Sequence, residues 1–174
     1  MKARVVLLML FVGLMTMGFD CVNDSALISV NITGVTGTYN INAGGTGFDE
    51  SVTIKSSDYL NVDFGTLNLN TTRIYDIRVT TLGTFAGTVS GQVLVNGTQI
   101  LAFNGPWASF NTPQSLVTSP LFDRSQAAAG IAALVQAIRN RNDITLRGLG
   151  RTSQAVPSGL AVKVEVFAQV DAEL

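Results

Sequence analysis

The sequence predicts a mainly β protein: an antiparallel β-sandwich, or a partly open barrel, with one α-helix in the C-terminal half. About nine short β-rich runs are separated by Gly, Asn and Asp residues, a spacing that is typical of sandwiches and barrels. One segment instead carries apolar residues at helical spacing, so we expect a helix over about residues 124–140. The length of 174 residues fits a single domain once a leader is removed.

Four runs between residues 26 and 64 predict the first strands. Residues 26–32 and 38–42 alternate between apolar and polar side chains, and Thr33-Gly34 separates them. Residues 51–55 and 59–64 follow after a Gly-rich loop and are also typical of strands. We therefore expect four separate strands in this part of the chain.

The middle of the sequence contains a strong hairpin signal. Asn96-Gly97 stands between β-rich runs over 85–95 and 98–103, and Asn-Gly favours the tight turn that joins antiparallel strands. The preceding run, 73–80, loses strict alternation at Tyr75-Asp76, where we expect a β-bulge.

After an irregular stretch, the hydrophobic period changes to that of a helix. Asp123 is the candidate N-cap, and Gln126 follows three residues later as in a capping box. The apolar face of the helix consists of Ile131, Leu134, Val135 and Ile138. The final run, 160–168, alternates almost perfectly and predicts a half-exposed antiparallel strand.

The N-terminus has the pattern of an export signal. Lys2 and Arg4 precede an apolar run over residues 5–15, which is shorter than the roughly 20 residues of a membrane-spanning helix. We expect residues 1–20 to be a signal peptide and residues 21–174 to form one mature domain.

The single cysteine, Cys21, directly follows this segment. A Cys at this place resembles the acceptor of bacterial lipoproteins, and the resemblance implies that its sulfur is acylated after cleavage before it. The family has a small residue before the Cys, whereas this chain has Asp20. Cleavage after Gly18 with plain secretion is one alternative, and a retained anchor is another.

The composition argues against enzymatic and nucleic-acid-binding functions. The chain has no His, one Cys and 13% charged residues, so the common general bases and metal ligands are scarce. Its net charge of -1 is unlike that of a nucleic-acid-binding protein. We therefore expect no catalytic residues, no cofactor and no metal site.

One short motif is similar to a calcium-binding sequence. Residues 44–49, Gly-Gly-Thr-Gly-Phe-Asp, resemble the calcium-binding nonapeptide repeat, but the motif occurs once and a site of that kind needs stacked copies. A flexible loop between strands is the preferred interpretation. A loose cation site formed by Asp49, Glu50 and Asp58 is the alternative.

Two groups of apolar residues are candidate binding elements. Phe103, Trp107 and Phe110 flank a Pro-containing loop, which predicts either an aromatic binding rim or a plug at the end of the core. The apolar helix face defined above predicts either the wall of a pocket or tight packing against strands.

These observations predict an exported bacterial envelope protein that acts as a non-enzymatic binding or structural module. A lipid on Cys21 would hold it at the outer membrane, cell surface or periplasm, and without the lipid it would be secreted. The expected partners are an envelope protein, a polysaccharide or further copies of the chain, because strands with few lysines leave sheet edges weakly guarded. A carrier of a small apolar ligand and a self-assembling surface subunit are the alternatives.

Overall fold

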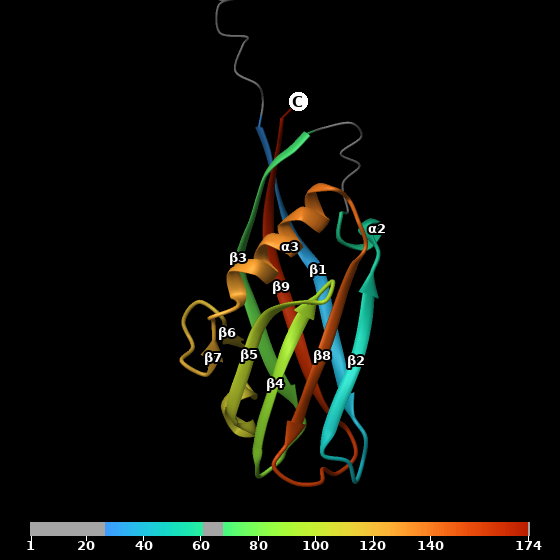
Figure 1. The fold of residues 1–174 in the computed structure, drawn as a ribbon, viewed down its shortest axis with the longest axis vertical. Helices are drawn as coiled ribbons and strands as arrows, with labels where there is room; N and C mark the ends of the chain where they lie inside the picture. The colour runs from blue at the N-terminus through green and yellow to red at the C-terminus, as the bar shows by residue number, and fades with distance from the viewer. Residues whose placement is uncertain (1–26, 61–67, 174) are drawn as a thin grey trace, which may run out of the picture.

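The computed structural model describes residues 27–60 and 68–173, and it confirms the predicted fold class: two antiparallel sheets form a β-sandwich with one main helix (Figure 1). The strand orders are β1-β9-β3-β6 in one sheet and β2-β8-β4-β5-β7 in the other. The strands are β1 (Leu27–Ile41), β2 (Gly47–Ile54), β3 (Asn68–Leu82), β4 (Thr88–Val95), β5 (Thr98–Pro106), β6 (Gln114–Ser115), β7 (Phe122–Asp123), β8 (Ile144–Thr152) and β9 (Leu160–Glu173). The helical elements are α2 (Ser56–Tyr59), the 3-10 helix η1 (Trp107–Phe110) and α3 (Ala127–Arg139).

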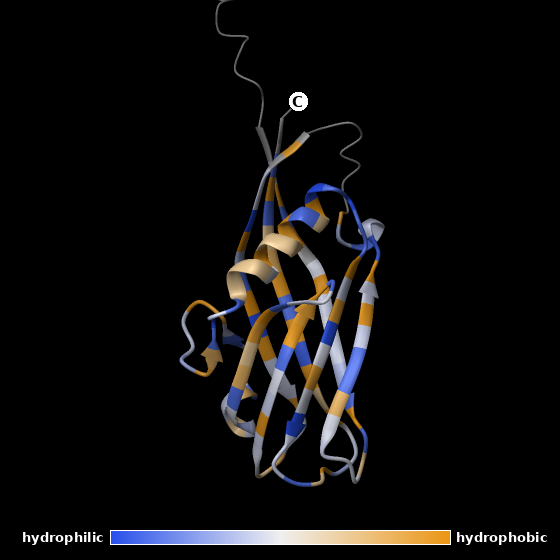
Figure 2. Cartoon of the chain, viewed as in Figure 1, coloured by the Kyte–Doolittle hydropathy of each residue, from blue (hydrophilic) through white to orange (hydrophobic). Residues whose placement is uncertain are grey.

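The last strand, β9, shows how alternation in the sequence becomes a two-faced strand. Val162, Val164 and Val166 are buried, whereas Lys163 and Glu165 between them are half-exposed. Because successive side chains of a strand point to opposite faces, one face of β9 lies in the core and the other faces solvent. Figure 2 shows hydrophobic and hydrophilic residues alternating along other strands as well.

The first strand differs from the prediction. Instead of two separate strands, one long β1 pairs with β9, with a register shift between Ile32 and Val35. Gly34 lies at this irregularity, where a Cβ atom would come within 2.9 Å of the Asp58 carbonyl oxygen. The break in the sequence pattern therefore marks a bulge within one strand, and not a turn between two.

The strand predicted over 59–64 does not begin as expected. Ser56–Tyr59 forms the short helix α2, in which the Asp58 carboxylate accepts a hydrogen bond from the backbone N–H of Lys55 at 3.3 Å. Such local hydrogen bonds favour a turn over an extended strand. Residues 61–67 lie outside the described part of the chain, as do the predicted signal peptide and Cys21.

Two local predictions are confirmed. β4 and β5 form an antiparallel hairpin around Asn96-Gly97, whose φ angles of 47° and 84° are of the sign that a type I′ turn requires. In β3, the register with β9 shifts between Ile74 and Asp76, which makes Tyr75 the extra residue of the predicted bulge.

The main helix begins later than predicted, at Ala127, and Asp123 is not its N-cap. The Asp123 carboxylate instead accepts a hydrogen bond from the backbone N–H of Ser125 at 2.8 Å, which forms a turn before the helix. α3 contacts β5 of one sheet and β3 of the other, and so closes one open side of the sandwich (Figure 1). No helix in the described ranges is both long and apolar enough to cross a bilayer.

A glycine brings α3 into backbone contact with β5. Gly130 is buried, and a Cβ atom on it would lie 2.5 Å from Ile100 Cα and closer still to the carbonyl oxygen of Gln99. Ile100 is the extra residue where the register of the β4–β5 pair shifts. The helix can therefore pack at this distance only because residue 130 has no side chain.

Candidate binding surface

The aromatic residues predicted as a possible rim are buried. Phe103, Trp107 and Phe110 all belong to the core. The Trp107 indole N–H donates a hydrogen bond to the Gly83 carbonyl oxygen at 2.9 Å, and its ring packs edge-on against Phe85 with centroids 5.7 Å apart. The predicted rim is therefore replaced by the alternative, a plug of the core: η1 turns Trp107 and Phe110 inward, and Phe103 of β5 packs against Phe110 with ring centroids 5.7 Å apart.

The helix face predicted as a possible pocket wall also packs as core. Leu134 and Ile138 are fully buried, and Ile131 and Val135 are partly buried. Ile131 borders a hollow of about 50 Å³ at the edge of β3, whereas pockets for small molecules measure roughly 300–1,000 Å³. The hollow is thus too small for the apolar ligand of a carrier.

The three carboxylates of the alternative cation site do not converge. Asp49 accepts two hydrogen bonds from Arg147, both at 2.7 Å, and this pairing lowers the pKa of the Asp49 carboxyl. Glu50 accepts a hydrogen bond from the backbone N–H of Asn40, and Asp58 caps α2. Within the described ranges, no three His, Cys, Asp or Glu side chains gather as metal ligands would.

An exposed aromatic surface lies on the outer face of the four-stranded sheet. Tyr75 is 48% exposed, and its ring centroid is 6.0 Å from that of Phe167, a half-exposed residue of the neighbouring strand β9. The guanidinium carbon of Arg78 lies 4.5 Å from the Phe167 ring centroid, within the range of a cation–π interaction. We call Tyr75, Phe167 and Arg78 the aromatic platform.

The bulge in β3 explains the exposure of Tyr75. In a regular strand, residues alternate strictly between the two faces, but an extra residue interrupts this order and re-aims a side chain. Ile74 packs against the core and Ile77 lies within it, whereas Tyr75 between them faces solvent. A local irregularity of the backbone therefore places an aromatic ring on the surface.

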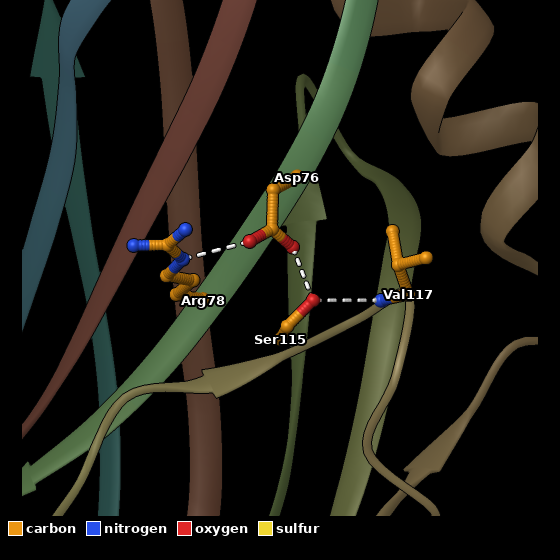
Figure 3. A network of polar contacts seen from close by, with 4 residues as sticks. All are labelled: Asp76, Arg78, Ser115 and Val117. Carbon is orange, nitrogen blue, oxygen red and sulfur yellow. Dashed lines mark hydrogen bonds and ion pairs between the residues drawn. The ribbon is translucent and has the colours of Figure 1, made fainter.

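A buried carboxylate holds the cation of the platform in place (Figure 3). Asp76 is only 8% exposed, and its Oδ2 accepts a hydrogen bond from Arg78 Nε at 2.7 Å. Its Oδ1 accepts one from the Ser115 hydroxyl at 2.6 Å, and the Ser115 oxygen accepts one from the backbone N–H of Val117 at 3.1 Å. This network restricts the Arg78 side chain through Nε and leaves its two Nη nitrogens for other acceptors.

The chain after β6 extends the exposed apolar surface beside the platform. Val117 is 59% exposed, and it lines the hollow of about 50 Å³ together with Tyr75 and Ile131. Exposed apolar side chains gathered in this way are typical of interaction sites. The platform therefore has an apolar margin on its β6 side.

A wider hollow of about 450 Å³ lies on the five-stranded sheet. Its lining includes Gly91 and Gly150, which pair across β4 and β8. The aromatic residue that lines this hollow, Phe48, is buried. Asp49, which also lines the hollow, is already paired with Arg147. The hollow thus presents no exposed ring, and the platform is the stronger candidate for binding.

The free edges of the two sheets differ in their protection. The edge strand β2 contains Asp49 and Glu50, whereas β1 has no charged residue over its 15 residues. Charged residues on an edge discourage pairing with another chain. β1 is therefore the less guarded of these two edges.

The platform offers two kinds of group that a ligand could contact. Its rings offer flat faces to an apolar surface of a ligand, and its fixed guanidinium offers N–H donors to an acceptor. The nearest carboxylate, Asp76, is buried and engaged by both Arg78 and Ser115.

Sequence reasoning did not select Tyr75, Phe167 or Arg78 as site residues, although two signals were present. The loss of alternation at Tyr75-Asp76 predicted a bulge, and a bulge can expose a ring that strict alternation would bury. Phe167 follows Lys163 and Glu165 at intervals of two residues, and this spacing places it on the same solvent face of β9.

Comparisons with known proteins add little to this geometry. No known protein family matches the chain, and no curated protein matches it. Among solved structures, a chain of Desmodium yellow mottle tymovirus is similar at 9% sequence identity and a TM-score of 0.35, covering 86% of this chain and 90% of that chain. A similarity at this level carries no argument about function.

Proposed function

We propose that this protein is an exported, non-enzymatic binding module of the cell envelope that contacts its partner through the aromatic platform. The observation that carries this proposal is the exposed Tyr75 ring beside Phe167 and Arg78, on a sheet face open to solvent. Aromatic residues and Arg contribute most of the binding energy in many interfaces. An envelope polysaccharide or protein is the kind of partner that such a surface fits.

We propose Cys21 as the point of attachment to the membrane. It stands at the end of the apolar leader and six positions before Leu27, where β1 begins. Intact mass spectrometry of protein from its native envelope tests this: the expected species begins at Cys21 and carries the added mass of acyl chains. More than one chain is expected, because a single acyl chain anchors a protein only marginally. An unmodified chain that begins at Phe19, or the full-length chain, would contradict the lipid anchor on Cys21.

Removal of the Tyr75 ring is expected to weaken binding to envelope material. The Tyr75→Ala variant of the mature protein should bind at least about tenfold more weakly than wild type, since a central aromatic residue often contributes about 2 kcal/mol or more. Co-sedimentation with washed, delipidated envelope polysaccharide, and separately with purified envelope protein, measures the bound fraction over a range of concentrations.

Leu82→Ala provides the matched control for this experiment. Leu82 is also an exposed apolar residue of β3, but it lies outside the platform. We expect this variant to bind as wild type does, and circular dichroism checks that both variants are folded. If Tyr75→Ala and Leu82→Ala both bind like wild type, the platform is not the contact surface.

A further inference from the structure

We infer that the ligand of the aromatic platform is an acidic polysaccharide, in which a uronic acid ring stacks on Tyr75 while its carboxylate binds Arg78. The inference rests on the proposed function, because it names the ligand class for the same surface. Three features carry it: the fixed position of Arg78, the charges around it, and the way rings and cations are arranged along β3.

The guanidinium of Arg78 is held in place without any ligand. Its Nε is bound by Asp76 at 2.7 Å, and its carbon lies 4.5 Å from the Phe167 ring centroid. Holding a side chain in its binding geometry lowers the entropy cost of association. A planar guanidinium with free Nη nitrogens recognises a carboxylate through hydrogen bonds that a neutral hydroxyl matches less well.

The carboxylates around the platform are already engaged by cations. Glu165 is engaged by Lys163 at 2.7 Å, and Asp76 is engaged by Arg78. Arg73 is exposed and lies opposite Gln169 of β9, which places it on the same outer face as the platform. This face therefore presents arginine donors to a ligand, while its neighbouring carboxylates already have partners.

The order of residues along β3 matches a polymer of acidic rings. Arg73 and Arg78 lie on either side of Tyr75 along the strand, so that a cation flanks the exposed ring in both directions. A uronic acid has an apolar C–H face for stacking and a carboxylate on the same ring, and a polyuronate repeats both in every unit. An acidic peptide side chain has no such flat face beside its carboxylate, so we favour the polysaccharide.

Calorimetric titration with polygalacturonate, and with neutral galactan for comparison, tests the inference. Wild-type protein is expected to bind polygalacturonate at least about tenfold more tightly than galactan. The Arg78→Gln variant is expected to bind polygalacturonate at least about tenfold more weakly than wild type. Added salt should weaken the binding of polygalacturonate, because a charge interaction at the surface is screened.

Two further variants keep the test specific. Arg151→Gln removes one exposed cation from the outer face of the other sheet, near its wide hollow, and should leave binding unchanged. Arg73 lies outside the network drawn in Figure 3. Arg73→Gln should therefore weaken polygalacturonate binding by a smaller factor than Arg78→Gln. It also supplies a folded variant should the loss of Arg78 leave Asp76 buried without its cation and unfold the protein.

The outcomes separate this inference from the proposed function. Equal affinity for both glycans, unchanged by Arg78→Gln but abolished by Tyr75→Ala, would overturn the acidic ligand and support the platform as a glycan-binding surface. Binding of polyglutamate but of neither glycan would overturn the polysaccharide in favour of an acidic protein. Binding of none of these probes, together with unchanged envelope binding by Tyr75→Ala, would overturn the proposed function as well.

Discussion

Replacement of Gly130 by alanine is expected to destabilise the protein by at least about 2 kcal/mol, although alanine is the better helix former by about 1 kcal/mol. The added methyl would lie within 2.5 Å of Ile100 Cα and against the carbonyl oxygen of Gln99. Both are backbone atoms of a strand in the core, which cannot move aside as a flexible side chain could. α3 would have to lift from β5, and the contacts of Leu134 and Ile138 would loosen with it.

Urea unfolding followed by far-UV circular dichroism measures this effect. Ala132→Gly is the matched control, because Ala132 is exposed on the same helix and its loss should cost only the helix propensity, about 1 kcal/mol. A Gly130→Ala variant that is more stable than wild type would show that α3 does not approach β5 as closely as described.

Truncation of Trp107 to alanine is expected to cost about 3–5 kcal/mol, the range for a large aromatic side chain in a core. Trp107 is completely buried, donates its indole N–H to the Gly83 carbonyl oxygen and packs against the edge of Phe85. Alanine would leave a large cavity and an unpaired carbonyl oxygen. This loss is a large fraction of the roughly 5–15 kcal/mol by which most domains are stable.

Trp107→Phe separates the two contributions. It keeps much of the packing and removes the indole N–H, so we expect it to lose less stability than Trp107→Ala. Circular dichroism must follow unfolding in both variants, because they lack the single Trp of the chain. A cost below about 1 kcal/mol for Trp107→Ala would indicate that the side chain is exposed, as in the predicted rim, since surface substitutions have small effects.

The features that the sequence predicted well depend on neighbouring residues. The Asn96-Gly97 hairpin follows from the conformations that these two residues tolerate, and the two faces of β9 follow from strict alternation. The bulge at Tyr75 was likewise predicted from a break in the local pattern. Each of these features could be read without knowing which strands pair with which.

The features that were missed depend on contacts between distant segments. Gly34 reads as a break in the sequence, but β1 continues through it because β9 pairs with both of its halves. Trp107 lies in an irregular, Pro-containing segment whose sequence fits both a rim and a core plug, and the choice depends on Gly83 and Phe85, which enclose it from another part of the chain. The platform likewise needs Phe167 to lie beside Tyr75, and their proximity follows only from the pairing of β3 with β9.

The pairing of Leu27 with Glu173 has a mechanical consequence. The beginning of β1 and the end of β9 lie side by side, so a force that pulls these two ends apart acts across the strands. It would break the β1–β9 hydrogen bonds one after another, as a zipper opens, and would need little force at any moment. A force between Leu27 and Leu160, which lies opposite Ile41 at the other end of the pair, would instead act along the strands and load many of these bonds together. The molecule should therefore resist a load along its strands much better than one that separates its two ends.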